Sequence, residues 1–482
     1  LIFNRLQNTV NPWLAASYHW EQPTRLVFQL RHDVHWTDGQ PFTSDDVAYT
    51  LTLLKQYPAL DSNALWHTIK DVANPDPYTV VINLRQPSNP LLWYLAGQTY
   101  IVPRHIWQQV KDPVNDQNSH PIGTGPFKLK SFDPALYILA RNPGYWQPGK
   151  PYVDQLRYPA YESNNSADLI LTQGSIDWTG LFSEKVDENF VKRDPIHDHY
   201  WFPPVSVVMF YLNTAKYPFN NLAVRQAISL AIDRQRLSKE GEKGLEQPAH
   251  PSGLVLPSEK PFLDPHYADL SFSVDVNRAR TLLGNAGFTL NSQGIYADQQ
   301  GRPLSFSIMV VDGWTDWEAD SHFIADDLSK IGMQVDVDTV DYNDYIPSLQ
   351  KGNFDSAISW TNSGPSPYFA LNGLLATANS APLGDIAATN WGRWQDDNTD
   401  KLLKQYAQAD TSNTQLQLQA LAGLQKIMVE QVPAVPLLYA ANWYEYTTTR
   451  FTGWPTQDNP YALPAPYSYP DSEVVALNIH RV

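Results

Sequence analysis

Apolar residues recur along the first 120 residues at two spacings, which predict both strands and helices. The apolar runs within 26–31 and 78–84 are typical of buried strands. Between them, the apolar residues at positions 47, 51 and 54 follow the 3.6-residue turn and therefore share one face of a helix. That helix is expected to begin at Thr43 or Ser44, because either side chain can accept hydrogen bonds from the free N–H groups of a first turn.

From about residue 212 onwards, helical and strand patterns alternate one by one. Strands are predicted at 306–311, 334–340 and 356–360, and helices at 224–232, around 323–331 and at 345–351. Single helices between successive strands are typical of βαβ units with a parallel sheet. A final apolar run at 474–479 predicts one more strand.

The length and composition indicate a folded, multidomain α/β protein. Its 482 residues exceed the 250–300 at which a single core stops growing, and 43% hydrophobic with 17% charged residues is an ordinary globular balance. We therefore expect two or three domains, with a cleft between two lobes as the place for a small ligand.

Charge and residue usage exclude several classes of partner and cofactor. The formal net charge of −16 disfavours nucleic acid and anionic membranes, because both repel an acidic surface. Cysteine is absent, which rules out a thiol nucleophile and cysteine-ligated metals. No apolar run approaches the ~20 residues of a membrane span. The sequence opens as if inside a strand, so we expect a leader that has been removed.

Catalytic and metal-binding motifs are not found in the sequence. It contains no Gly-x-Ser-x-Gly elbow, no His-Glu-x-x-His helix and no phosphate-binding Gly-rich loop ending in Lys. His197 and His199 are two residues apart, which places them on opposite faces of a strand rather than around one metal ion. We expect no enzymatic activity, no catalytic residues, no cofactor and no metal.

Several sequence blocks, taken in order, resemble one family of transport proteins. They are LRHDVHWTDGQPFTSDDV at 30–47, PIGTGPF at 121–127, RNPGYW at 141–146, LNTAKYPFN at 212–220 and VRQAISLAIDR at 224–234. Together they resemble the large solute-binding proteins of ABC importers, family 5, which serve peptides, nickel and oligosaccharides. The resemblance implies a two-lobed periplasmic-binding-protein fold of type II with an extra domain.

The resemblance also implies a division of the chain into three domains. The first lobe would comprise 1–19, 121–211 and 455–482, the extra domain 20–120, and the second lobe 212–454. It further implies a periplasmic or extracellular monomer, lipid-anchored in its precursor, that delivers its ligand to the permease domains of an ABC importer.

The branch of the family is indicated by one missing acid and two aromatic stretches. Peptide-binding members have a Trp-x-x-Asp-x-x-Asp-Pro segment whose Asp pairs with the ligand amine, whereas 360–368 reads WTNSGPSPY. The stretches DGWTDW at 312–317 and YTTTRFTGW at 446–454 are similar to cello- and chito-oligosaccharide binders. We therefore expect a β-linked oligosaccharide, whose apolar ring faces stack on aromatic side chains.

By this resemblance, a set of six residues would contact the ligand. Trp314 and Tyr467 would stack on sugar rings and Asn362 would bind hydroxyl groups. Trp391 and Arg393 occupy the positions of a polar–aromatic pair, although the local sequence departs from the family there, and Trp360 ends a strand either in the site or in the core.

Two other interpretations stay open at this point. A peptide or another amine could bind through carboxylates such as Asp385 or Asp316 in place of the missing acid. A glycoside hydrolase would require two carboxylates that face each other across the cleft.

Overall fold

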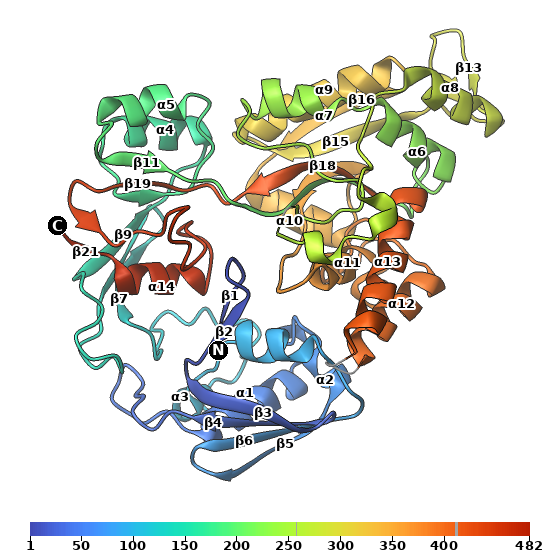
Figure 1. Ribbon diagram of the computed structural model, residues 1–482. Coiled ribbons are helices and arrows are strands. Elements are labelled where there is room, and N and C mark those ends of the chain that lie inside the picture. The colour runs from blue at the N-terminus through green and yellow to red at the C-terminus, as the bar shows by residue number, and fades with distance from the viewer. Residues whose placement is uncertain (257, 410–412) are drawn as a thin grey trace.

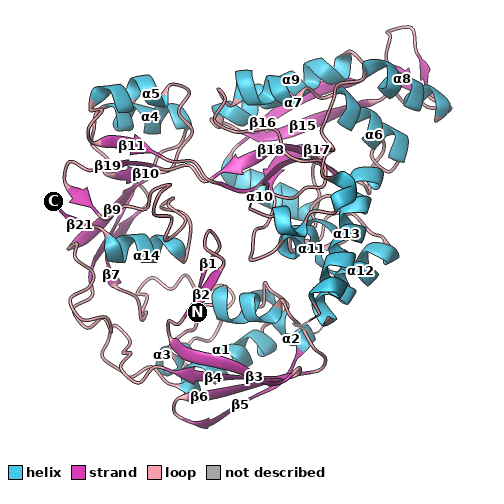
Figure 2. Cartoon of the chain, viewed as in Figure 1, coloured by secondary structure: helices cyan, strands magenta, loops and turns pink. Residues whose placement is uncertain are grey.

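The structure is a computed structural model, and it describes residues 1–256, 258–409 and 413–482. Figure 1 shows three sets of elements, with the N-terminal hairpin of β1 (Ile2–Asn4) and β2 (Thr9–Asn11) between them. Figure 2 shows that each set combines sheet and helix, so the predicted α/β class is confirmed.

The blue part of the chain in Figure 1 contains a four-stranded antiparallel sheet, in the region that the sequence predicts as the extra domain. The strands are β3 (Ala15–Gln22), β4 (Arg25–Leu30), β6 (Thr79–Leu84) and β5 (Ile69–Asp76), in that spatial order, and the helices are α1 (Ser44–Gln56), α2 (Leu65–Thr68) and α3 (Arg104–Trp107). Helix α1 begins where the capping pattern predicts, because the Thr43 N–H donates to Asp46 Oδ2 at 3.0 Å in a capping box.

The first lobe contains small antiparallel sheets whose strands come from distant parts of the chain. One sheet has β7 (Phe127–Asp133), β8 (Leu136–Arg141) and β9 (Gln155–Pro159); another has β10 (Trp178–Thr179), β19 (Glu445–Thr447) and β11 (Asp198–Tyr200); a third pairs β20 (Phe451–Thr452) with β21 (His480–Arg481). Its helices are α4 (Asn164–Thr172), α5 (Val186–Asn189) and α14 (Asp471–Asn478).

The second lobe is built on a five-stranded mixed sheet. Its spatial order is β16 (Gln334–Val340), β15 (Ser305–Val311), β17 (Ser356–Trp360), β12 (Pro204–Leu212) and β18 (Ala434–Ala441). The helices are α6 (Leu222–Ala231), α7 (Arg234–Arg236), α8 (Val276–Asn285), α9 (Thr315–Ser329), α10 (Tyr342–Lys351), α11 (Pro367–Leu375), α12 (Asp397–Gln408) and α13 (Thr414–Gln431), and a short hairpin joins β13 (Thr289–Leu290) to β14 (Tyr296–Ala297).

The parallel prediction holds for only part of this sheet. Strand β15 runs parallel to β16 and β17, as the alternating pattern predicts, because α9 and α10 make the crossovers. Strand β12 is antiparallel to both β17 and β18, so the sheet is mixed.

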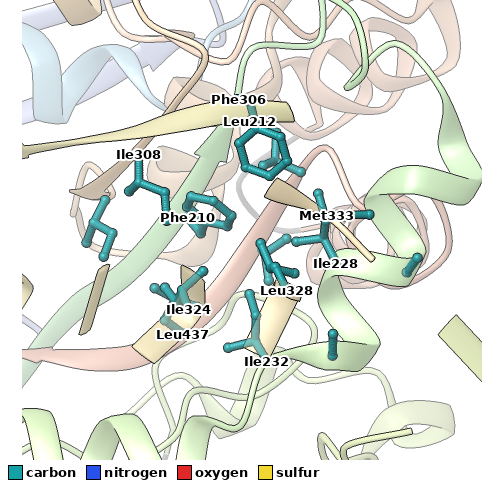
Figure 3. Packing of buried hydrophobic residues seen from close by; sticks show 14 of the residues in the cluster. Phe210, Leu212, Ile228, Ile232, Phe306, Ile308, Ile324, Leu328, Met333 and Leu437 are labelled. Atoms are coloured by element: carbon teal, nitrogen blue, oxygen red, sulfur yellow. The ribbon is translucent and has the colours of Figure 1, made fainter. Parts of the chain in front are cut away.

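Alternate side chains of the central strands anchor the helices that cover one face of this sheet. Phe210, Phe306 and Ile308 point towards Ile228 of α6 and Leu328 of α9 in Figure 3, and all five are buried. Burial of one large apolar side chain contributes about 1.5–3 kcal/mol. The cleft-facing residues at the strand ends are therefore held by a rigid core.

Two neighbouring segments connect the first lobe to the second. The Trp201 N–H donates to the Tyr444 carbonyl at 3.1 Å, and the Asn442 N–H donates to the Pro203 carbonyl at 2.9 Å. The chain therefore crosses between lobes near residues 203 and 442. Strand β12 pairs with β18 of the second lobe, whereas β19 and β20 pair with strands of the first lobe. The lobe boundaries expected from the sequence at 211 and 454 stay a prediction.

The strand predicted at 474–479 is wrong, because these residues belong almost entirely to α14. Val475, Ala476 and Leu477 are buried, and a short apolar run by itself does not distinguish a buried strand from a buried helix. Asp471 and Glu473 lie in the first turn, where negative charge stabilises a helix N-terminus, and they are the signal that the hydrophobic pattern omits.

Candidate ligand-binding cleft

A cavity of about 770 Å³ lies between the two lobes beside their connecting segments. This volume is within the range of about 300–1,000 Å³ that is typical of small-molecule sites. Both lobes supply its lining, and so does the N-terminal hairpin through Arg5. The Arg5 Nη1 donates to Ser363 Oγ, which joins the hairpin to the loop after β17.

Aromatic rings form the wall contributed by the second lobe. Trp314, Trp317 and Trp360 have ring centroids 5.2–6.1 Å apart, and Tyr342 lies 5.8 Å from Trp314. Trp314 comes directly before α9, at the end of the turn that leaves β15, and Trp360 is the last residue of β17. The wall therefore forms where the carboxyl ends of two parallel strands meet.

The opposite wall carries Trp443 from the connecting segment and Tyr467 from the C-terminal segment. The Trp443 ring packs edge-on against Phe202 and Phe182, and its backbone N–H donates to the Tyr467 hydroxyl at 3.1 Å. Tyr467 is 52% exposed, so part of its surface is accessible.

The two lobes touch beside the cavity. The Asn164 N–H at the start of α4 donates to the Gly313 carbonyl at 3.2 Å, and the Asn164 side-chain amide donates to Asp316 Oδ1 at 3.2 Å. Gly313 has φ +82°, and a Cβ there would lie 2.9 Å from the Cβ of Ser163. Glycine is therefore required at this contact, and the lobes are in a closed arrangement.

Carboxylates supply most of the charge in the cavity. Asp316 and Glu246 both line it and are buried, whereas Glu162 lies exposed among the lining residues. Burial raises the pKa of Asp316 to about 6, against the hydrogen bonds from α9 and Asn164 that lower it. Burial, with negative neighbours, also raises the pKa of Glu246. At Arg5, burial lowers the pKa of the guanidinium against the attraction of Asp471.

Three of the six residues proposed from sequence come together in this cavity: Trp314, Trp360 and Tyr467. The other three lie elsewhere. Asn362 is exposed and packs against Gly373 of α11. Trp391 lies in the core, with its ring edge-on to Trp360 at 6.4 Å.

Arg393 is held away from the cavity by the second lobe itself. Its guanidinium is buried and donates to the backbone carbonyls of Gln350 at 2.7 Å and Asp385 at 3.2 Å. Asp385 itself is on an exposed loop outside the cavity, whereas Asp316, the other carboxylate considered from the sequence, is in the lining.

Sequence reasoning missed Trp317, Tyr342, Trp443, Glu246 and Arg5 as lining residues. The sequence did contain a pattern that indicates Trp317 as a site residue, because Trp317 belongs to the same aromatic stretch, 312–317, as Trp314. Trp443 and Glu246 had none, since their positions depend on the crossing between lobes and on the path of a loop.

A family model described as "Bacterial extracellular solute-binding proteins, family 5 Middle" matches residues 9–382. The chain belongs to this family. Its members are binding proteins rather than enzymes. This agrees with the expectation from the sequence, in which no catalytic motif was found. Among the described residues, no helix is both long and apolar enough to cross a membrane.

Named relatives of this solute-binding protein differ in what their names say they bind. The oligopeptide-binding protein AppA of Bacillus subtilis is 26% identical over 340 residues, which cover 68% of this chain and 60% of AppA. The nickel-binding periplasmic protein of Escherichia coli is 27% identical over 358 residues, which cover 70% of this chain and 64% of that protein. The aligned part thus spans less than two thirds of either relative.

A solved structure matches the fold along the whole chain. It is the mannohexaose-bound form of a protein from Thermotoga maritima named as a periplasmic oligopeptide-binding protein of an ABC transporter. Its TM-score is 0.92 at 24% sequence identity, and the match covers 100% of this chain and 92% of that one. At this identity the likeness establishes the fold.

Proposed function

We propose that this family 5 protein captures a β-linked oligosaccharide, of the cello- or chito-type, in the cleft between its lobes and delivers it to an ABC importer. The observation that carries this proposal is the arrangement of aromatic rings around one closed cavity. Trp314, Trp317 and Trp360 form one wall, and Trp443 and Tyr467 line the other side.

The chemistry of these walls suits a sugar ring. A β-linked pyranose has two apolar C–H faces, which stack on indole and phenol rings, and a rim of hydroxyl groups. Polar residues of the cavity lining can bind these hydroxyl groups, among them Arg5, Asn164 and Asn442. Stacking contributes affinity, and the hydrogen bonds contribute discrimination.

The mannohexaose-bound Thermotoga protein supports this choice, since a protein of the same fold holds a hexasaccharide. The second candidate is a peptide, which is favoured by the buried carboxylates Asp316 and Glu246 and by relatives named for oligopeptides and glutathione. We place the protein outside the cytoplasmic membrane, acting as a monomer with the permease domains, and lipid-anchored in its precursor.

The first prediction is that calorimetric titration detects binding of β-linked di- to hexasaccharides. The intact sugar should be recovered after prolonged incubation, because a binding protein leaves the glycosidic bond unbroken. Tripeptides serve as the comparison ligands. Heat with peptides and none with any β-linked sugar would contradict the proposal, and so would release of shorter sugars.

The second prediction concerns closure of the lobes about the segments near residues 203 and 442. The ligand contacts both lobes, so it should stabilise the closed arrangement in which Asn164 reaches Gly313 and Asp316. Small-angle scattering should show a smaller radius of gyration at saturating sugar than without sugar. An unchanged radius would exclude hinge closure on binding.

A further inference from the structure

Four carboxylic acids gather behind and within the cavity wall of the second lobe; they are Glu242, Glu246, Asp316 and Asp320, and we call them the acid cluster. Asp316 and Asp320 are four residues apart on α9 and therefore share one face of that helix. Burial, together with the charge of its neighbours, raises the pKa of Glu242 and of Asp320. All four side chains are buried.

The loop that carries Glu242 and Glu246 is fixed against both α9 and β18. Asp320 packs so closely on Gly241 that a Cβ there would lie 1.9 Å from Asp320 Oδ1. Further along the loop, the Ser238 hydroxyl donates to the Glu246 carbonyl at 2.6 Å, and the Tyr439 N–H of β18 donates to the Gln247 carbonyl at 2.8 Å. The backbone therefore holds Glu246 at the cavity.

One carboxylate oxygen of Glu246 accepts a hydrogen bond, and the other has no partner among the described residues. Its Oε1 accepts the Ala441 N–H at 2.6 Å, whereas Oε2 is buried and has no hydrogen-bond partner among the described residues. The Glu246 side chain lines the cavity and its residue is only 3% exposed. A buried carboxylate oxygen without a partner costs about 1–3 kcal/mol or more, so this atom indicates a group that is supplied by the ligand.

Two basic side chains near the acid cluster and the cavity, Lys243 and Arg5, interact with other residues. The Lys243 ammonium, whose charge acts on Asp320, lies 3.6 Å from Glu184 and donates to the Glu240 carbonyl. Arg5, the only basic residue among the described lining residues, donates to Ser363 and lies near Asp471. The cavity thus holds more negative than positive charge, with Glu162 adding to the excess at its exposed side.

We propose that Glu246 and Asp316 form a subsite for a protonated amine on the bound ligand. A buried carboxylate is stabilised by a paired, hydrogen-bonded cation, and an ammonium group brings three donors to these oxygens. The inference rests on the proposed function in one respect, because it takes the amine to be carried by a β-linked amino sugar.

The surroundings of Asp316 favour the amino sugar over a peptide N-terminus. Asp316 lies between Trp314 and Trp317 in sequence, and both rings belong to the stacking wall. An equatorial amine on a pyranose projects from the rim of the ring. A ring stacked on this wall can therefore present its amine to the carboxylates beside the wall, while its faces stay on the indoles.

Titration with three tetrasaccharides tests the subsite, since they differ only in the substituent at carbon 2. They are the glucosamine tetramer, the N-acetylglucosamine tetramer and cellotetraose, with an amine, an acetamide and a hydroxyl group. At pH 6.5 the protein should bind the glucosamine tetramer at least about tenfold more tightly than cellotetraose, as expected for charge-assisted hydrogen bonds.

Glu246→Gln and Asp316→Asn should each reduce that preference by about tenfold or more, because each replaces a carboxyl group that can ionise and pair with the amine by a neutral amide of the same shape. Asp336→Asn is the matched control, since Asp336 is exposed on β16 and outside the cavity. It should leave the preference unchanged. Melting temperatures establish that the variants are folded.

Trialanine and N-acetyl-trialanine separate this inference from the proposed function. Equal affinity for all three tetrasaccharides, or a preference retained in both cavity variants, would overturn the subsite and leave sugar binding intact. Amine-dependent binding of trialanine, lost in the variants, without any sugar binding would support the subsite and overturn the proposed function. Heat with none of these ligands would overturn both.

Discussion

Replacement of Trp314 by alanine should weaken sugar binding by about 1–3 kcal/mol, which is roughly five- to 150-fold in dissociation constant. Trp314 contacts three other rings of the aromatic wall and lines the cavity, so its loss removes stacking surface and loosens its neighbours. Calorimetric titration with the tightest-binding oligosaccharide measures this change. Only a modest fall in melting temperature is expected, because the ring is partly exposed.

Trp391→Ala is the matched control, because it truncates a tryptophan that belongs to the core and neighbours Trp360. Trp391 is 7% exposed, and its ring packs against Tyr211 at 5.6 Å as well as against Trp360. Its truncation should reduce the free energy of unfolding by about 3–5 kcal/mol. A large stability loss in Trp314→Ala with unchanged affinity would place Trp314 in the core and remove it from the site.

Asp316→Asn should stabilise the ligand-free protein at pH 8 by about 2 kcal/mol. Burial raises the pKa of Asp316 from its usual 3.8 to about 6, and two pKa units correspond to about 3 kcal/mol. The negative charge also stabilises the first turn of α9, so its removal offsets up to about 1 kcal/mol of this gain in stability. Asparagine can still accept the hydrogen bond from Asn164.

The pH dependence of this gain follows from the direction of the shift. The folded state holds the Asp316 proton more tightly than the unfolded chain does, so the wild type loses stability as the pH rises from about 4 to about 6. Above that window the loss is constant. Urea unfolding of wild type and variant at pH 4, 5, 6 and 8 should show a stability difference that grows through the window and then levels. A variant that is less stable than wild type at pH 8 would contradict a buried, destabilising charge.

The two predictions together distinguish the two proposed parts of the binding site. The aromatic rings are expected to contribute affinity, whereas burial of the acid cluster is expected to cost stability in the ligand-free protein. A ligand that pairs with a buried carboxylate would offset that cost. We therefore expect Asp316→Asn to gain stability and to lose binding selectivity.

Local sequence alone determined much of the second lobe and the extra domain. The strands at 334–340 and 356–360 are found at their predicted bounds, and the helix at Thr43 begins at its capping box. These elements follow from hydrophobic period and capping, which act over a few residues. The ordered sequence blocks between 30 and 234 predicted the family, which the family model confirms. The aromatic stretch at 312–317 predicted part of one wall of the cleft.

Tertiary structure alone decided which of the candidate residues meet. Asn362, Trp391 and Arg393 suit a sugar site by residue type, yet packing of α11 and the second-lobe core turns them away from the cavity. Trp443 and Glu246 line the cavity because the chain crosses between the lobes beside them. Strand β19 joins the first lobe by pairing with strands more than 240 residues earlier. Contacts between distant segments depend on how whole elements pack, and the spacing of neighbouring residues carries no record of that packing.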